Sequence, residues 1–352
     1  MNTQRLNVMR LGRAVGLVAG SLALTLVVAA CGGANGGGTS SANKATLVLY
    51  NAQHEELTQA VAEGFTRESG IKVELRSGED PELANQILAE GDASPADVFV
   101  TENSPSMTLL ASQGRFSPVD AAAKAQVPSQ YSAADGSWVG WAARSTVLAY
   151  NPGRLRPSSL PVSIMELAEP KWAGKVGIAA AGADFQAIVS AVLQLRGEAA
   201  TAAWLKGLKA NAKIYQGNSA AMKAVNAGQV EASIIYHYYW YKDQAESGQN
   251  TKNVKLLYFG KKDPGAFVGV SGAGVLASSK YQVEAQQLVK YLTSKEGQQI
   301  VAASPALEYS LSPQVPTNAA LKPMSELDPP VIDIAQLNGP KVVELLMQAG
   351  LL

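Results

Sequence analysis

Blocks of apolar and polar residues alternate along the chain after residue 44, and their period changes between that of strands and that of helices. Short runs of apolar and β-branched residues, such as Thr46–Asn51 and Ala96–Thr101, predict buried strands. The stretch His54–Ser69 carries apolar residues three or four positions apart and is followed by Gly70, which predicts a helix with a glycine stop. The chain therefore begins its folded part with alternating strands and helices.

The same patterns continue to the end of the chain. Further strands are predicted at Ile71–Leu75, Lys175–Ala179, Glu231–Tyr236 and Val254–Phe259. Further helices are predicted from Asp80 to Gly91, from Ser104 to Gly114, and at Asp184–Arg196, Glu198–Lys209, Ser219–Ala227, Tyr281–Leu292, Glu296–Ala303 and Lys341–Ala349. Two apolar stretches, Ser145–Tyr150 and Val268–Ala277, are predicted crossover strands between two halves. Repeated strand–helix units indicate α/β lobes with parallel sheets, and the ligand cleft is expected at the carboxyl ends of the strands.

The first thirty residues have a different character. Arg5, Arg10 and Arg13 form a basic start, and the apolar run Val15–Ala30 follows it. The run is shorter than the roughly 20 residues that a membrane span needs, and it has the plan of a secretory signal peptide. It ends at Cys31 in a pattern that resembles a bacterial lipobox, so we expect Cys31 to be acylated and to become the new N-terminus. A buried structural cysteine is the alternative.

The composition of the residues after Cys31 differs from that of the leader and of the folded part. Glycine, serine and asparagine dominate the residues after Cys31, which is typical of a flexible tether. We predict these parts: a signal peptide at 1–30, a lipid-anchored tether at 31–44, an N-lobe at 45–146 plus about 270–320, and a C-lobe at 147–269 plus about 321–352.

Composition and charge exclude several classes of protein. Apolar residues make up 47% of the chain and charged residues 16%, which excludes a disordered protein. Lysine plus arginine count 29 and so do aspartate plus glutamate; loss of the leader leaves 26 basic residues, so nucleic acid is not expected as a partner. One cysteine excludes an internal disulfide framework, and two histidines exclude a three-histidine zinc site.

Candidate metal ligands follow the predicted strands. His54 comes after the first strand, Glu102 follows Ala96–Thr101, and four of the 12 tyrosines lie within Tyr236–Tyr241. Phenolate and carboxylate oxygens suit a hard, highly charged cation, and two phenolates with one carboxylate balance the charge of Fe(III). A neutral imidazole adds a fourth ligand without charge. An aromatic platform that stacks on a sugar, or an interface, is the alternative function of such a tyrosine cluster.

Several motifs in one order give the chain a resemblance to a known family. They are Tyr50-Asn51-Ala52-Gln53-His54, Ser94-Pro95-Ala96-Asp97-Val98-Phe99, Glu169-Pro170-Lys171-Trp172, Gly197-Glu198-Ala199-Ala200, Trp204-Leu205-Lys206-Gly207-Leu208-Lys209, Tyr238-Tyr239-Trp240, Asp263-Pro264-Gly265-Ala266, Ser271-Gly272-Ala273 and Lys295-Glu296-Gly297-Gln298. The chain from about Lys44 to Leu352 resembles the bacterial periplasmic ferric-iron-binding proteins of ABC importers. The resemblance implies the two-lobed type II periplasmic-binding-protein fold, with Fe(III) held by His54, Glu102, Tyr238 and Tyr239.

The resemblance also implies a synergistic anion, commonly phosphate, beside the iron. The matching loop is Gly182-Ala183-Asp184 ahead of a helix, and Asn218 matches one amide of the family's anion site. Backbone N–H groups at a helix start favour an anion. Asp184, however, places a carboxylate beside this loop and would repel phosphate.

A second departure lies at Tyr236, where phosphate-binding members carry asparagine, and Asn103 replaces a longer glutamine. We therefore expect carbonate, another small anion or water in place of phosphate, with Tyr236 as a candidate third phenolate. Arg144, just before the first crossover strand, is the candidate that neutralises an anion. His237 is expected to be structural.

The sequence thus predicts a monomeric ferric-iron-binding lipoprotein that captures Fe(III) between two lobes. It would close on the ion and deliver it to an ABC-type permease in the membrane, without chemical turnover. The alternatives are a lipoprotein of the same fold for a sugar, a thiamine-like cation or a phosphonate, and a secreted enzyme on this scaffold. Against the enzyme, Ser271 has no histidine near it in the sequence. The expected location is the cell envelope, on the outer side of the cytoplasmic membrane or in the periplasm.

Overall fold

The structure, a computed structural model, describes residues 45–305 and 307–352, and these belong to one compact unit. The predicted signal peptide, the tether and Cys31 lie outside the described residues. Within the part that is described, no helix combines the length and the apolar character needed to cross a bilayer.

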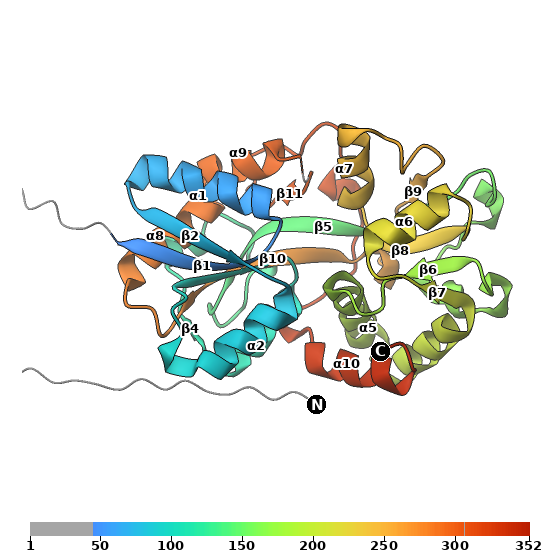
Figure 1. The fold of residues 1–352 in the computed structure, drawn as a ribbon, viewed down its shortest axis with the longest axis horizontal. Coiled ribbons are helices and arrows are strands. Elements are labelled where there is room, and N and C mark those ends of the chain that lie inside the picture. Colours follow the sequence, from blue (N-terminus) through green and yellow to red (C-terminus); the bar gives the residue numbers. More distant parts are fainter. Residues whose placement is uncertain (1–44, 306) are drawn as a thin grey trace, which may run out of the picture. The chain divides into compact units, whose positions relative to one another are not determined.

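Strands and helices alternate through the described chain (Figure 1). The strands are β1 (Thr46–Ala52), β2 (Lys72–Ser77), β3 (Val98–Thr101), β4 (Phe116–Ser117), β5 (Val139–Tyr150), β6 (Val176–Ile178), β7 (Ala212–Ile214), β8 (Ala232–Tyr236), β9 (Lys255–Leu257), β10 (Val268–Leu276) and β11 (Tyr309–Ser310). The α-helices are α1 (Glu55–Ser69), α2 (Asp80–Glu90), α3 (Ser104–Ser112), α4 (Ala121–Lys124), α5 (Ala183–Asn211), α6 (Asn218–Asn226), α7 (Tyr238–Glu246), α8 (Gln282–Thr293), α9 (Lys295–Ala303) and α10 (Gly339–Gln348).

The strands form one hydrogen-bonded order, β2-β1-β3-β10-β5-β8-β6-β7. β1 pairs in parallel with β2 and β3, and β6 pairs in parallel with β7 and β8. β5 and β10 lie in the middle of this order and are antiparallel to their neighbours. The sheet is therefore mixed: the strand–helix units are parallel as predicted, and the two long crossover strands add antiparallel pairs.

β5 runs from one hydrophobic core into another. Its first half, up to Ser145, pairs with β10, and its second half, from Thr146, pairs with β8. Val139 to Ala143 belong to a core that includes β1, β3 and α8, whereas Leu148 and Tyr150 belong to a core that includes α5 and α10. Figure 1 shows β5 and β10 passing across the middle between these two groups of elements.

Two local predictions are confirmed, and one helix was not predicted. Gly197 has a positive φ of 78° and breaks α5 at the place where two helices were predicted. The strand predicted at Glu231–Tyr236 ends at Tyr236 as expected, but no helix was predicted after it, and Tyr238 begins α7. The cluster thus changes from strand to helix within two residues, so the side chains of Tyr236, His237 and Tyr238 do not alternate between two faces of a sheet.

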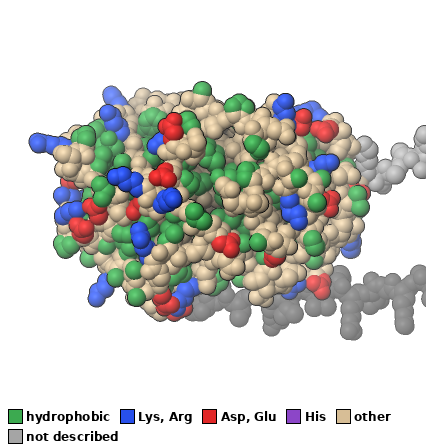
Figure 2. Space-filling model, turned by 180° about the vertical axis from the view of Figure 1, so that it is seen from behind, with side chains coloured by type: hydrophobic (Ala, Val, Ile, Leu, Met, Phe, Trp, Pro, Cys, Tyr) green, Lys and Arg blue, Asp and Glu red, His purple; other side chains and the backbone are tan. Residues whose placement is uncertain are grey.

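Charged side chains of both signs are interspersed on the surface that Figure 2 shows. This face shows no extended patch of one charge. A ligand of one sign has no extended attracting field there. Specific binding of a charged ligand therefore has to come from a smaller, enclosed group of residues.

Candidate metal centre

Two parallel strands bring His54 and Glu102 together. β1 pairs with β3 so that Ala52 lies opposite Thr101, and the chain leaves both strands at the same edge of the sheet. His54 then precedes α1, and Glu102 directly follows β3. The His54 Nε2 and Glu102 Oε1 atoms are 3.7 Å apart. Strand ends of parallel units thus place an imidazole beside a carboxylate.

The adjacent tyrosines Tyr238 and Tyr239 reach the same centre from a different part of the chain. Tyr238 and Tyr239 begin α7 directly after β8. The Tyr238 hydroxyl donates to Glu102 Oε1 at 2.6 Å, and the Tyr238 ring lies edge-on to the His54 ring with centroids 4.6 Å apart. Tyr239 packs on Tyr238 with ring centroids 4.2 Å apart. The four residues proposed as metal ligands therefore meet, although three separate segments carry them.

Asp184 completes the centre from the first turn of α5. Its Oδ2 atom accepts from the Tyr239 hydroxyl at 3.0 Å, from the Tyr238 hydroxyl at 3.2 Å and from Asn218 Nδ2 at 2.7 Å. Its Oδ1 atom accepts from Asn103 Nδ2 at 3.0 Å. Asp184 is buried, so one carboxylate is aimed at both phenols and held there by two amides.

The residues assigned to an anion surround this carboxylate. Gly182 is the N-cap of α5 and Ala183 its first residue, while Asn218 begins α6 and donates to Asp184. The Asp184 carboxylate therefore lies in the first turn of α5 and contacts the first residue of α6, beside the loop to which the sequence assigned a synergistic anion. Tyr236 is buried nearby, and its hydroxyl donates to Asn103 Oδ1 at 3.3 Å.

Arg144 has a partner that the sequence did not predict. Its Nη2 atom lies 2.7 Å from Glu308 Oε2, and both side chains are fully buried. Glu308 Oε1 in turn lies 3.0 Å from His54 Nδ1. Ligand atoms of His54, Glu102 and Glu308 lie within 4.8 Å of one another. No spacing pattern indicates Glu308, because it lies more than 200 residues after Glu102 and precedes a strand of only two residues.

Protonation of the centre follows from its burial. Burial, with the charges of Asp184 and Glu102, raises the pKa of Tyr238 and of Tyr239 well above the usual value for phenols. Burial, with the charge of Asp184, raises the pKa of Glu102 to about 7. Without a cation, both phenols hold their protons at neutral pH and donate them to the carboxylates. Only a strong positive charge placed between the phenols and the carboxylates would favour loss of the phenol protons.

The buried ion pair of Arg144 and Glu308, next to His54, stays charged without a metal ion. Burial raises the pKa of Glu308, but Arg144 and His54 outweigh it and hold that pKa below its ordinary value. Burial likewise lowers the pKa of His54, but its contacts with Glu308 and Glu102 raise it above the ordinary value. Glu308 is therefore an ionised carboxylate that compensates Arg144 inside the protein.

Two backbone groups bind the ring of His237 and direct it away from the proposed metal ligands. Its Nδ1 atom accepts from the Ser145 N–H at 3.1 Å, and its Nε2 atom lies 2.9 Å from the Leu307 carbonyl oxygen. The ring packs against Tyr309 with centroids 5.0 Å apart. Burial lowers the pKa of His237 to about 4. A neutral imidazole with Nε2–H satisfies both backbone groups.

The chain matches a known protein family over two thirds of its length. Residues 93–328 match the family model described as bacterial extracellular solute-binding protein. The chain belongs to that family. The match confirms a binding protein rather than an enzyme, as the sequence predicted.

Three relatives of this solute-binding protein bear on the centre. It is 54% identical over 306 residues to an Fe(3+)-binding periplasmic protein of Serratia marcescens, covering 87% of this chain and 90% of the relative. The crystal structure of iron-bound HitA from Pseudomonas aeruginosa matches with a TM-score of 0.82 and 42% identity, covering 87% of this chain and 99% of that one. A Trichodesmium protein in complex with iron and citrate matches with a TM-score of 0.77 and 25% identity, covering 87% and 99%. These likenesses confirm the type II periplasmic-binding-protein fold.

Proposed function

We propose that this solute-binding protein captures Fe(III) in the periplasm and delivers it to an ABC-type importer. The observation that carries the proposal is a continuous set of contacts between donor groups: His54 lies beside Glu102, Tyr238 contacts both Glu102 and Asp184, and Tyr239 contacts Asp184. Tyr238, Tyr239, Glu102 and Asp184 supply oxygen donors, and His54 supplies nitrogen. The resemblance to an Fe(3+)-binding periplasmic protein and to an iron-bound structure supports the same function.

The charges of these groups favour a trivalent ion. With the ion bound, the carboxylates of Glu102 and Asp184 and the two phenolates would together supply up to four negative charges. Hard oxygen donors of this charge suit Fe(III) better than a softer divalent metal. The hydrogen bonds from Tyr238 to Glu102 and from Tyr239 to Asp184 mark the protons that the ion would displace.

Asp184 changes the proposed role of an anion. Its carboxylate lies within hydrogen-bonding distance of both phenols, where a synergistic anion would otherwise complete the ligand set. We infer that Asp184 is a direct fifth ligand residue and that phosphate is not required. A small carboxylate ligand stays compatible with the fold, since a related structure contains iron together with citrate.

The proposed capture joins two lobes. The first buried core includes residues up to Ala143 and from Val268 to Ile334, and the second runs from Leu148 to Phe267 and from Leu337 to Leu351. This packing supports the proposed division at residues 146 and 269, and we infer a third boundary between 334 and 337 in place of one near 320. His54 and Glu102 then belong to one lobe and Tyr238 and Tyr239 to the other, so the ion favours the closed state.

Membrane attachment through Cys31 is a separate proposal. The signal-like leader and the lipobox-like pattern before Cys31 support it. Diacylation at one cysteine supplies two chains, which suffices for stable anchoring. Mass spectrometry of the protein from a membrane fraction tests it: a Cys31-containing N-terminal peptide with a lipid mass supports the anchor, and a soluble Cys31→Ser variant is the control.

The absorption spectrum tests the ferric function. Addition of one equivalent of Fe(III) to metal-free protein should produce a visible phenolate-to-iron charge-transfer band. Tyr238→Phe combined with Tyr239→Phe should abolish the band and weaken binding by at least 10³-fold in competition with citrate, as expected when two charged ligands are lost (about 1.4 kcal/mol for each factor of ten).

A matched tyrosine serves as control. Tyr241 lies on the same helix, and its hydroxyl is 3.4 Å from the Tyr258 hydroxyl rather than at the centre. Tyr241→Phe should keep both the band and the affinity. Tyr236→Phe tests the third phenolate: an unchanged band excludes it as a ligand. A wild-type protein that binds Fe(III) no better than the double variant would refute the proposed function.

A further inference from the structure

Glu308 is a buried carboxylate whose position the proposed ligand set does not explain. It reaches the centre from the residue before β11, and its side chain is fully buried. Its Oε1 atom lies 3.0 Å from His54 Nδ1, although the ring N–H does not point straight at the oxygen. Within the described residues neither of these two buried atoms makes a hydrogen bond of good geometry, so the 3.0 Å contact between them is the polar contact that the structure gives them.

The two nitrogens of His54 therefore face two different carboxylates. Nδ1 lies against Glu308, which is fully buried, and Nε2 lies on the side of Glu102, whose side chain is 17% exposed. The Tyr238 hydroxyl donates to Glu102, whereas Glu308 contacts His54, Arg144 and Gln53. The ring thus separates an inner carboxylate from the point where the proposed ligands converge.

The other oxygen of Glu308 is already engaged. Arg144 Nη2 donates to Glu308 Oε2 at 2.7 Å, and Gln53 Nε2 lies 3.3 Å from the same atom. Ser271 Oγ accepts from both of these donors at 2.6 Å. A buried carboxylate with a buried arginine partner is held in place strongly, because separation would leave an uncompensated charge inside the protein.

We propose that Glu308 is a positioning residue for His54. It accepts the Nδ1–H of the imidazole, which leaves Nε2 without a proton and directed at the ferric ion. A histidine that binds a metal through one nitrogen commonly donates the other N–H to a carboxylate, which fixes the tautomer and the ring orientation. The inference rests on the proposed ferric function, and Glu308 itself does not bind the ion.

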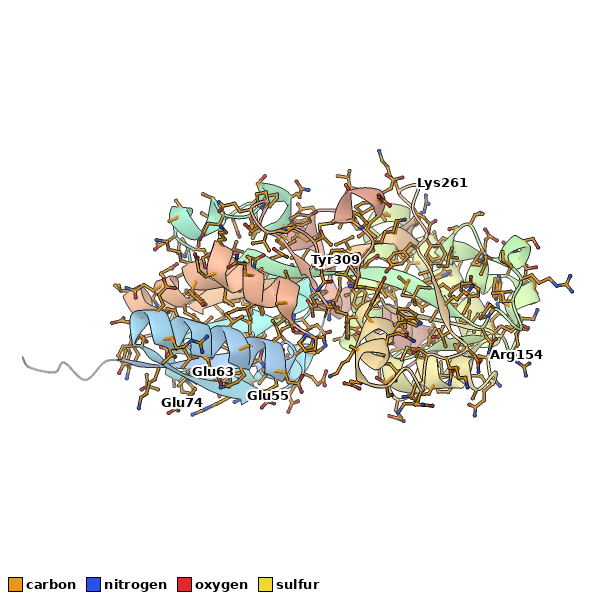
Figure 3. All side chains as sticks on the ribbon, turned by 90° about the horizontal axis from the view of Figure 1, so that it is seen from above. Glu55, Glu63, Glu74, Arg154, Lys261 and Tyr309 are labelled. Carbon is orange, nitrogen blue, oxygen red and sulfur yellow. The ribbon has the colours of Figure 1, made fainter. Side chains whose placement is uncertain are left out.

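The same carboxylate connects His54 to the two long crossover strands. Arg144 belongs to β5 and Ser271 to β10, and the pairing of these strands shifts register between Ser271 and Gly272. Tyr309, the neighbour of Glu308, lies midway between the two ends of the molecule in Figure 3. Glu308 thus fixes the ring relative to β5 and β10 and not only relative to the loop after β1.

Nitrogen NMR of the metal-free protein tests the tautomer directly. The chain has only two histidines, so selective ¹⁵N-histidine labelling gives two ring systems, and His54→Gln assigns them. At pH 8.5 the wild-type His54 should carry its proton on Nδ1. In Glu308→Gln the amide can turn its NH2 group toward the ring, and the spectrum should shift to a mixture or to the Nε2–H form.

Competition with citrate measures the effect on the ion. Glu308→Gln should weaken Fe(III) binding by about 10- to 100-fold, the usual effect of losing such a partner, while the charge-transfer band persists. Asp263→Asn is the matched control, because Asp263 is also buried and accepts from the Ile164 and Gly265 N–H groups. It should lower stability and leave the Fe(III) affinity within twofold.

The outcomes separate this inference from the proposed function. An unchanged tautomer in Glu308→Gln overturns the positioning role, whatever the affinity. Loss of the ion comparable to the double tyrosine variant, with an unchanged tautomer, would instead make Glu308 a ligand. Where Glu308→Gln does not fold, the wild-type tautomer decides: Nε2–H in the wild type overturns the inference. Failure of the wild type to bind Fe(III) refutes the proposed function and leaves the tautomer measurement valid.

Discussion

His237 makes the stability of the metal-free protein depend on pH between about 4 and 6.5. Burial lowers its folded-state pKa to about 4, whereas an unfolded histidine titrates near 6.5. Between these values the unfolded chain binds a proton that the folded chain does not bind. The histidine's contribution is therefore complete above pH 6.5 and is lost as the pH falls toward 4.

The magnitude follows from the size of the shift. A difference of roughly 2.5 pKa units corresponds to about 3 kcal/mol, at about 1.4 kcal/mol for each unit. The physical cause is visible in the structure: a charged ring would have two N–H groups, and its Nδ1–H would face the Ser145 N–H that now donates to it. A buried imidazolium would therefore lose one hydrogen bond and gain a repulsive contact.

Urea unfolding of metal-free wild type and His237→Gln between pH 4 and 7.5 tests this reasoning. The variant loses the acceptor for Ser145 and should be less stable at pH 7.5. The gap in unfolding free energy between the two proteins should then shrink by about 3 kcal/mol as the pH falls to 4. All other titrating groups, His54 included, are present in both proteins and largely cancel in the difference. A gap that stays constant over this range would refute the assignment of a neutral, buried His237.

Three further predictions follow from the centre and the core. Asp184→Asn should make tight Fe(III) binding dependent on added carbonate or phosphate, measured by titration with and without the anion; anion-independent binding by the variant would contradict the role of Asp184. Binding of Fe(III) at pH 7.5 should release at least two protons, those of Tyr238 and Tyr239, measured by pH-stat; release of fewer than two would contradict phenolate ligation. Gln298→Leu should lower the free energy of unfolding in urea by about 4 kcal/mol or more, because the buried Gln298 amide donates to two carbonyls and accepts from two N–H groups. Gln287→Leu, at an exposed position, is the control. A loss below about 1 kcal/mol in Gln298→Leu would contradict the prediction.

The repeated units of the fold could be predicted because their signals are local. Thr46–Asn51 was predicted as a strand and His54–Ser69 as a helix from periodicity alone, and the structure has β1 and α1 there within two residues. The break at Gly197 was likewise predictable, since a positive φ favours glycine. Such signals depend only on neighbours in the sequence.

The short strands could not be predicted in the same way. β4 and β11 have two residues each, and they pair with β10 and β5 from distant parts of the chain. The change from β8 to α7 was missed for a related reason. Aromatic residues favour strands on average, but pairing of β8 with β5 ends at Tyr236, and Tyr238 and Tyr239 begin a helix.

The composition of the centre shows where sequence reasoning ends. Histidine, glutamate and tyrosines after strands indicated a hard cation, because that inference needs only the kinds of donor and the strand ends. The partners of those donors depend on which carboxylate the fold brings beside them. Asp184 was expected to repel an anion, and the structure shows it accepting from both phenols. Glu308 had no sequence signal, because its role depends on contacts with His54, Arg144 and Gln53.

These partners also explain how one arrangement serves the protein with and without its ion. In the metal-free centre, the phenol protons of Tyr238 and Tyr239 lie between oxygens that would otherwise repel each other. In the proposed complex, Fe(III) would take over that task with three charges, so binding would exchange the phenol protons for the cation. The charges of Arg144 and Glu308 neutralise each other with or without the ion, so this pair exchanges no proton when the ion binds. The affinity of the centre therefore depends on the proton concentration, because the protein holds protons where it would hold the ion.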